Sequence, residues 1–487
     1  MSIILFVENN AYARPNILLI VVDDLYADIS VFGNSRISTP NLDNLARRAT
    51  LFKQAYCSAP SCGPSRASLL TGILPSTSGL YYNSQPIIAE PDVQKQQPVN
   101  LPLHFKSNGY TTGLFGKIFH ADNQGEKIAK FASPGLFADH RGFWANIPES
   151  IKPGLRDYRR EGGSNFAWGA VPDDWEDKQQ PLVDTENTDR LIQALQQKHE
   201  VPFFLCLGYL RPHLPWVVPQ RFFDMYSLES ISLPAGFIEG DLNDLPECAK
   251  WMAHQVPGAL LGDSYLQKVI AEAGDWKRAI QAYQACISYV DDQLGRVLRA
   301  LENGPYADNT IIVLTSDHGY HLGEKEHWTK FGLWEQTLRV PLLIALPGQT
   351  TQTVETPVSL IDLYPTLVSL AGIQSPNQAL DGIDLAPLLL NPNLSRGRSV
   401  ISTYGYQNHS IRSMKYRYIR YRNGEEELYF HAKDPFEFQN LAENPEFQQI
   451  ITSFQKDLPE INLPEASSGS SLGWNPAVFE PGYLYSP

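Results

Sequence analysis

The feature that most constrains the fold is a set of short, almost continuously apolar runs. Residues 16–22 read Asn-Ile-Leu-Leu-Ile-Val-Val, and similar runs recur at residues 202–207, 310–314 and 341–345. A strand with one face in water alternates apolar and polar residues, whereas a strand covered on both faces is continuously apolar. The runs therefore predict strands of a mostly parallel sheet with helices on both faces.

Helical patterns lie between these runs. Residues 42–49 and 278–301 carry apolar residues at helical spacing, and the second segment is long and amphipathic. Strands that alternate with helices predict an α/β sandwich, in which sites form beyond the carboxyl ends of the strands. A chain of 487 residues is long enough for one large domain and a smaller one.

The pattern changes near residue 391. Three short, alternating and tyrosine-rich runs follow, at residues 400–404, 413–421 and 426–430. Asn423-Gly424 is a strong hairpin signal between the last two runs. We therefore predict a catalytic domain over residues 14–390 and a small α+β domain with an antiparallel sheet over residues 391–487.

The charge balance limits the possible partners. The formal net charge is −14, from 53 acidic and 39 basic residues, which argues against nucleic acid as a partner. An anionic substrate would need a locally basic, recessed site, because the field of the whole molecule opposes it. No apolar run approaches the length of a membrane-spanning helix.

The first residues suggest export. Residues 3–7 are apolar, and Ala11-Tyr12-Ala13 resembles a signal-peptidase site. The segment predicts a shortened signal sequence and a periplasmic or secreted protein. The apolar run is short and no basic residue precedes it, so an ordinary cytosolic N-terminus remains the alternative.

Two of the predicted strands end in acidic residues. Residues 16–22 are followed by Asp23-Asp24, and residues 310–314 are followed by Thr-Ser-Asp317-His318-Gly. Adjacent strand residues point to opposite faces, so the two carboxylates converge only if the chain leaves strand geometry there. Taken singly, each motif is more simply a helix cap or a loop histidine. Together they favour a site for one hard cation, calcium or magnesium.

Residues 62–72, Cys-Gly-Pro-Ser-Arg-Ala-Ser-Leu-Leu-Thr-Gly, carry the most specific motif. Pro64 suits a first helical turn and Gly72 a helix end. Cys62 then lies at the N-terminus of a helix, where free N–H groups favour an anion, and Arg66 lies one turn below on the same face.

The pattern C-x-P-S-R followed by L-L-T-G resembles the signature of the type I, formylglycine-dependent sulfatases. In that family a maturation enzyme oxidises the cysteine to formylglycine, so the resemblance implies that enzyme as a partner. It extends from Pro15 to about Leu441. It implies an alkaline-phosphatase-like sandwich, with a large mixed, mostly parallel sheet between helices, and hydrolysis of sulfate esters.

Two segments are most similar to the iduronate-2-sulfatase-like branch. Lys117 and His120 are three residues apart, as in that branch, and the segment at residues 211–216 reads Arg-Pro-His-Leu-Pro-Trp. Glu335 and Arg339 look more like choline sulfatases. The branch implies a sulfated saccharide as substrate, such as a uronate 2-sulfate, and Arg339 is a candidate to bind its carboxylate.

The resemblance also implies roles for individual residues. The metal, one Ca²⁺ per chain with Mg²⁺ as the alternative, would be bound by Asp23, Asp24, Cys62 in its modified form, Asp317 and His318. The position of His318 often binds through an amide oxygen in related enzymes. The sulfate pocket would be lined by Arg66, Lys117, His120, His213 and Lys330. Each of these basic residues, taken alone, could equally be a strand end, a loop residue or a surface charge.

The expected chemistry uses a formylglycine hydrate as nucleophile. His213, with Lys330, would protonate the departing alcohol, and His120 would take a proton from the second hydroxyl. Two other interpretations remain. One is a related aryl or choline sulfatase, or a phosphonate or phosphate ester hydrolase of the same superfamily. The other is a non-catalytic binder of sulfated glycans, although no residue of the site is lost.

Overall fold

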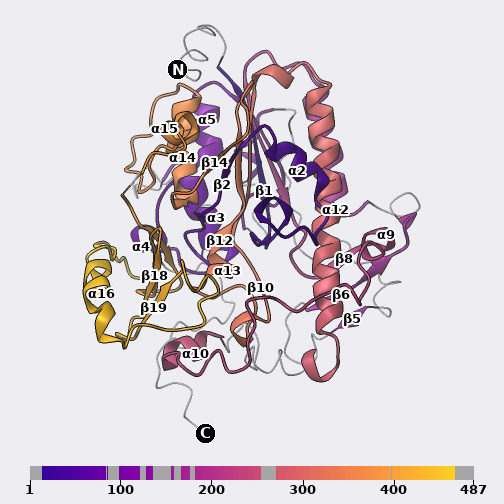
Figure 1. Ribbon diagram of the computed structural model, residues 1–487. Coiled ribbons are helices and arrows are strands. Elements are labelled where there is room, and N and C mark those ends of the chain that lie inside the picture. Colours follow the sequence, from indigo (N-terminus) through magenta and orange to yellow (C-terminus); the bar gives the residue numbers. More distant parts are fainter. Residues whose placement is uncertain are drawn as a thin grey trace.

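A seven-stranded sheet forms the centre of the computed structural model, which describes residues 14–83, 85, 98–120, 128–134, 136, 155–157, 166–175, 181–253, 270–395 and 397–466. Its strands follow the order β14-β2-β13-β9-β1-β7-β4. Figure 1 shows this sheet between layers of helices. Their bounds are β1 (Asn16–Val22), β2 (Thr50–Phe52), β4 (Thr111–Gly116), β7 (Phe203–Tyr209), β9 (Thr310–Ser316), β13 (Leu342–Ala345) and β14 (Gln352–Val354). β13 pairs antiparallel with β9 and β2, and the other pairs described in this sheet are parallel. The sheet is therefore mixed and mostly parallel, as predicted.

Strand β1 shows why its run is apolar after Asn16. Every one of its side chains is buried. Leu18, Ile20 and Val22 pack into one hydrophobic core, and Ile17, Leu19 and Val21 pack into a second core on the opposite face. The first core contains the apolar faces of α2 (Pro40–Ala46), α8 (Val183–Gln196) and α12 (Trp276–Glu302), and the second those of α3 (Cys62–Thr71), α5 (Leu101–Ser107) and α14 (Leu363–Leu370). In Figure 1, α12 and α14 accordingly lie on opposite sides of the sheet.

The remaining elements are short. Small sheets are formed by β3 (Ala55–Tyr56), β12 (Arg339–Val340) and β15 (Val358–Ser359), by β10 (His321–Leu322) and β11 (Trp328–Thr329), and by β5 (Arg156–Asp157), β6 (Ala167–Val171) and β8 (Trp216–Pro219). The short helices are α4 (Pro75–Ser78), α9 (Gln220–Phe223), α10 (Glu247–Ala253), α13 (Glu335–Leu338) and α15 (Ala386–Leu390). Among the described residues, no helix is long and apolar enough to cross a membrane. The predicted export signal at residues 3–13 lies outside the described residues.

Some predicted bounds are wrong. The predicted helix over residues 42–49 runs instead over Pro40–Ala46, because Pro40 occupies its first turn and residues 50–52 already form strand β2. The long helix begins two residues earlier than predicted, at Trp276.

The C-terminal region forms a four-stranded antiparallel sheet covered by α16 (Gln448–Gln455). Its strands are β16 (Val400–Thr403), β17 (His409–Arg412), β18 (Tyr416–Arg420) and β19 (Glu426–Phe430). Gly424, with φ of 96°, lies in the predicted hairpin turn. The prediction missed β17, whose sequence His-Ser-Ile-Arg lacks apolar alternation, and wrongly extended β18 to residue 413. The division at residues 390 and 391 stays a prediction.

Buried ion pairs join this sheet to the central region. Arg417 on β18 is 1% exposed and pairs with both Glu335 and Glu437. Arg412 Nε lies 3.4 Å from Glu335 Oε2. Since an unpaired buried charge is costly, these contacts make the two regions depend on each other.

We predict that Arg417→Ala lowers the free energy of unfolding by about 3–5 kcal/mol, because it removes a buried ion-pair partner from two buried carboxylates at once. The matched control is Arg420→Ala on the same strand, whose partner Glu426 is part-exposed. The control should cost about 0–1 kcal/mol. Denaturant unfolding measures both, and equal losses would show that the buried network contributes no more than a surface pair.

Candidate active site

The end of β1 brings two adjacent carboxylates together. Asp24 adopts a left-handed conformation with φ of 61°, which breaks the strand alternation that would separate Asp23 from Asp24. The Oη of Tyr283 on α12 donates to Asp24 O over 2.6 Å, and Asp24 N donates to Asp317 Oδ1 over 3.2 Å. The turn required by the sequence pattern is therefore present and stabilised.

The neighbouring strand supplies the second acidic motif. β9 lies parallel to β1 with Val22 opposite Ser316, so the residues that follow both strands emerge at one sheet edge. Ser316 Oγ lies 2.8 Å from Val22 O and accepts from Leu25 N over 3.0 Å. This side chain joins the two strand ends beside the acidic residues.

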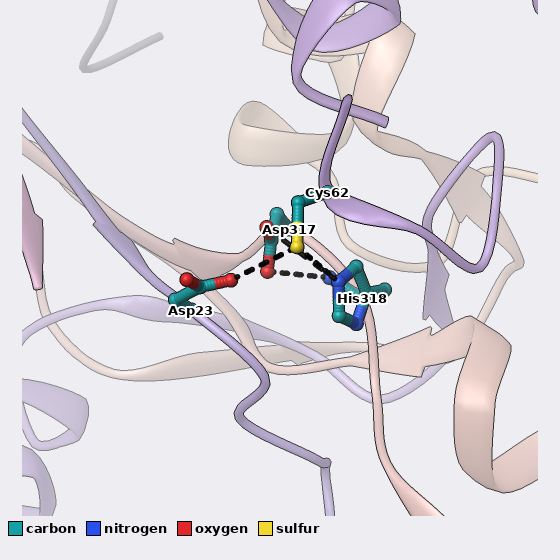
Figure 2. A group of neighbouring side chains, drawn as sticks. All are labelled: Asp23, Cys62, Asp317 and His318. Atoms are coloured by element: carbon teal, nitrogen blue, oxygen red, sulfur yellow. Dashed lines mark hydrogen bonds and ion pairs between the residues drawn. The ribbon is translucent and has the colours of Figure 1, made fainter. Parts of the chain in front are cut away.

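Helix α3 presents Cys62 to these residues. The helix begins at Cys62 and ends at Gly72, whose φ is 71°, as predicted. The thiol is fully buried, and its Sγ lies 3.4 Å from Asp23 Oδ1 and 3.3 Å from His318 Nε2. Figure 2 shows Asp23, Cys62, Asp317 and His318 pointing toward one another from three separate segments.

Three cations surround this acidic group. Lys330 Nζ lies 3.0 Å from Cys62 Sγ and 2.7 Å from Asp24 Oδ1. Lys117 Nζ pairs with Asp23. Arg66 donates from Nε to Asp317 Oδ2 over 2.8 Å and lies 3.6 Å from Asp23 Oδ1 through a terminal nitrogen. The buried carboxylates of the site are thus paired with buried cations of the same chain.

Two histidines complete the cluster. His213 Nδ1 lies 2.6 Å from Leu214 O, which can only accept, so Nδ1 carries a proton and Nε2 faces Asp24 Oδ2 at 3.9 Å. His120 hydrogen-bonds the Cys62 side chain. The structure therefore brings together the predicted metal ligands and the residues predicted to line the sulfate pocket.

The electrostatic environment changes the acidity of these groups. Burial alone would raise the pKa of the Cys62 thiol, but Lys117, Lys330 and His318 hold it well below its usual value. Burial raises the pKa of Asp317 to about 7, with Arg66 opposing the rise and Asp23 adding to it. So many buried anions in one place favour a bound cation.

The donor set fits a divalent metal. One ligand atom each from Asp23, Cys62, Asp317 and His318 lies within 4.8 Å of the others. His318 Nδ1 donates to Gly319 O over 2.9 Å, so Nε2, which lies 3.3 Å from Cys62 Sγ, is the ring nitrogen that would bind a metal. Two of these four atoms are carboxylate oxygens, the ligand type that calcium and magnesium prefer.

Glu335 and Arg339 do not join the cluster. Arg339 donates from Nε to Lys53 O over 3.0 Å, and its guanidinium lies 5.3 Å from the Phe32 ring centre. It lines a cavity of about 770 Å³ that none of the cluster residues lines. Glu335 is buried against Arg412 and Arg417. These contacts do not support the expectation that Arg339 binds a substrate carboxylate beside the sulfate.

Sequence reasoning missed three residues that support the cluster. Tyr283 holds the Asp24 turn from 259 positions along the chain, and no local pattern signals such a contact. Ser316 lies inside the second acidic motif, but its contacts depend on strand pairing. Ser65 donates to Asp317 O and belongs to the C-x-P-S-R pattern, which was the available signal.

Known proteins are similar to this chain in sequence and in fold. A sulfatase from Formosa agariphila is 39% identical over 465 residues, which cover 92% of this chain and 87% of the relative. Mouse iduronate 2-sulfatase is 33% identical, and the match covers 76% of this chain and 70% of the relative. A choline-sulfatase from Rhizobium meliloti is 31% identical, and the match covers 91% of this chain and 86% of the relative.

Solved structures share the fold. A phosphonate monoester hydrolase of Agrobacterium radiobacter has a TM-score of 0.71 at 23% identity, and the match covers 91% of this chain and 95% of that protein. A 2-O GAG sulfatase has a TM-score of 0.67 at 24% identity, with 91% and 90% covered.

The sandwich fold and the buried acidic cluster define an alkaline-phosphatase-like hydrolase of anionic esters. Within that class the family is settled by the sequence profiles. The sulfatase profile matches residues 15–373, and the N-sulphoglucosamine sulphohydrolase C-terminal profile matches residues 323–463. The chain belongs to the sulfatase family and is a hydrolase of sulfate esters.

We predict that calcium stabilises the folded chain through this cluster. A ligand that binds only the folded state at about one hundred times its Kd adds about 2.7 kcal/mol to the free energy of unfolding. Asp317→Asn should remove most of the shift in melting temperature on adding calcium, and Asp308→Asn at an exposed position should keep it. An equal shift in both variants would place the metal elsewhere.

Proposed function

We propose that this sulfatase acts on a sulfated saccharide, with formylglycine made from Cys62 and one bound Ca²⁺, or else Mg²⁺. The observation that carries the proposal is the position of Cys62, buried at the start of α3 between carboxylates and 3.0 Å from the ammonium of Lys330. A maturation enzyme would supply the modification, and the protein would be exported to the periplasm or secreted.

Asp23, Asp24, Asp317 and His318 would bind the cation. The hydrate of formylglycine offers two hydroxyls on one carbon, and a divalent cation lowers the pKa of a hydroxyl bound to it. The residues around the position of Cys62 then decide how the ester is oriented and where protons go.

The two lysines would neutralise the charge of the sulfate, and Arg66 that of the carboxylates. Lys117 and Lys330 border the nucleophile position and would contact the sulfate oxygens in a site that excludes water. The Arg66 guanidinium is engaged with Asp317, Asp23 and main-chain carbonyls. We therefore assign Arg66 to orienting the carboxylates and balancing their charge.

The two histidines would move protons. The N–H at His213 Nδ1 donates to Leu214 O, so Nε2 is the ring nitrogen that would deliver a proton to the departing alcohol. His120 hydrogen-bonds the side chain at position 62 and is placed to accept a proton from the second hydroxyl. One hydroxyl would attack sulfur as the alcohol leaves, which would join the sulfate to position 62 through that oxygen. Loss of the proton from the second hydroxyl would then form the aldehyde C=O bond and break the carbon–oxygen bond to the sulfate, which leaves as the free ion.

We predict that co-expression with a maturation enzyme converts Cys62 to formylglycine and that Cys62→Ala is inactive. Peptide mass spectrometry should find the aldehyde at position 62 alone. Cys57→Ala serves as the control, because Cys57 is equally buried but outside the C-x-P-S-R pattern. Full turnover in unmodified protein would contradict the mechanism.

We predict that His213→Ala slows alkyl and sugar sulfates by about 10²–10⁴-fold, as expected for loss of a general acid. Aryl sulfates with acidic phenols should be affected much less, because such leaving groups depart without a proton. The ratio of kcat/KM for the two substrate types measures this difference. An equal loss on both types would assign His213 a structural role.

The substrate class is proposed as a uronate 2-sulfate near a chain end. The Lys117-x-x-His120 spacing and the similarity to iduronate 2-sulfatase support it, and the similarity to a choline-sulfatase supports the second candidate. A panel of sulfated uronate, hexosamine and galactose oligosaccharides with choline sulfate decides between them. Choline sulfate turned over far faster than any uronate would reject the saccharide proposal.

Paired aryl sulfate and aryl phosphate substrates test the esterase class separately. The aryl sulfate should be preferred, whereas a preference for the aryl phosphate would indicate a phosphonate or phosphate ester hydrolase. A non-catalytic glycan binder would turn over neither ester, even with position 62 modified.

A further inference from the structure

The segment that carries Lys330 has an unusual backbone. We call residues 325–331 the Lys330 loop. Of the seven non-glycine residues with positive φ in the described part of the chain, four lie in this loop: Lys325 (54°), Glu326 (49°), Thr329 (78°) and Phe331 (81°). Left-handed geometry is unfavourable for L-residues, and especially for a β-branched threonine, so surrounding contacts must stabilise it.

Both ends of the Lys330 loop are bonded to distant segments. Lys325 Nζ donates to Asp241 Oδ1 over 2.9 Å. Phe331 N donates over 2.9 Å to the carbonyl of Pro60, two residues before Cys62. These contacts fix where the loop starts and ends, but they leave the carbonyl of Lys330 itself to another partner.

That partner is the imidazole of His327, which is fully buried. His327 Nε2 lies 2.5 Å from Lys330 O, and Nδ1 lies 2.8 Å from Ala253 O at the end of α10. Main-chain carbonyls only accept hydrogen bonds, so both ring nitrogens must donate. A histidine that donates from both nitrogens is the imidazolium cation.

Charged groups near His327 act on this state in opposite directions, since the carboxylate of Glu324 favours it and the ammonium of Lys325 opposes it. On its own segment the nearby groups are Lys325 and Glu324, the latter immediately before the loop and electrostatically coupled to His327. His321 on β10 packs edge-on at 5.2 Å between ring centres, and α10 contributes the carbonyl of Ala253. The oxygen of a main-chain carbonyl carries partial negative charge and favours a protonated partner.

We infer that His327 is a positioning residue for the reaction: by donating to Lys330 O and Ala253 O together, it sets the Lys330 loop so that Lys330 Nζ reaches Cys62 Sγ and Asp24. The inference rests on the proposed role of Lys330. Both ring nitrogens of His327 are engaged by these two carbonyls rather than by the nucleophile or the metal ligands, so the residue acts through the loop.

The test compares His327→Phe with His321→Phe. Both substitutions replace a fully buried imidazole by a ring, but His321 has no hydrogen-bond partner among the described residues, so only the first removes two hydrogen bonds. With modified protein and an aryl sulfate, His327→Phe should lower kcat by about ten- to hundred-fold, as expected for a misplaced catalytic group. His321→Phe should stay close to wild type. Similar losses in both variants would overturn the inference.

A double-mutant cycle separates positioning from a general structural effect. If His327 acts through Lys330, then His327→Phe should cause little further loss of kcat in a Lys330→Ala background. The same fold-loss in both backgrounds would overturn the inference while leaving the role of Lys330 intact. Wild-type turnover by Lys330→Ala alone would instead reject the proposed function of Lys330.

Protonation gives a readout that does not depend on activity. Nitrogen-15 NMR of histidine-labelled protein, assigned by loss of the signal in His327→Gln, should show hydrogen on both His327 nitrogens at about pH 7.5, one unit above the ordinary histidine pKa. A neutral tautomer at that pH would contradict the double donation. If His327→Phe does not fold, His327→Gln replaces it in the cycle, because the amide can donate to only one side.

Discussion

Neutralising the buried carboxylates at the ends of β1 and β9 is the requirement on which the rest of the site depends. Asp23, Asp24 and Asp317 lose their hydration when the sheet is covered on both faces, and unpaired charges there would be prohibitively costly. Each carboxylate pairs with a cation from a different part of the chain: Asp23 with Lys117, Asp24 with Lys330, and Asp317 with Arg66. The charge balance that stabilises the fold thus also brings together the residues that we propose to bind and hydrolyse the sulfate ester.

The C-terminal sheet contributes to this balance indirectly. The residues that follow Lys330 are held by it, since Trp334 Nε1 donates to a Glu427 carboxylate and Glu335 N donates to Glu437 Oε2. Glu437 O also accepts from Lys325. The C-terminal region therefore supports the segment that carries Lys330.

The sequence predicts the features that depend on residues close together in the chain. The bounds of β1, the start and end of α3 and the need for a break at Asp24 follow from apolar continuity, helix-end residues and strand alternation. The antiparallel direction of β13, strand β17 and the support of Asp24 by Tyr283 depend on pairing between distant segments, which no window of sequence contains. Arg339 shows the same limit: its motif suggested a substrate contact, but the surrounding fold directs it toward Phe32 and Lys53.

The central claim is that one modified side chain at position 62 performs the hydrolysis, and it can be measured directly. Preparations made with graded amounts of maturation enzyme contain graded fractions of formylglycine, which peptide mass spectrometry quantifies. Turnover of a sulfate ester per chain should rise in proportion to that fraction and extrapolate to zero when no aldehyde is present. Turnover that is independent of the fraction would contradict the account.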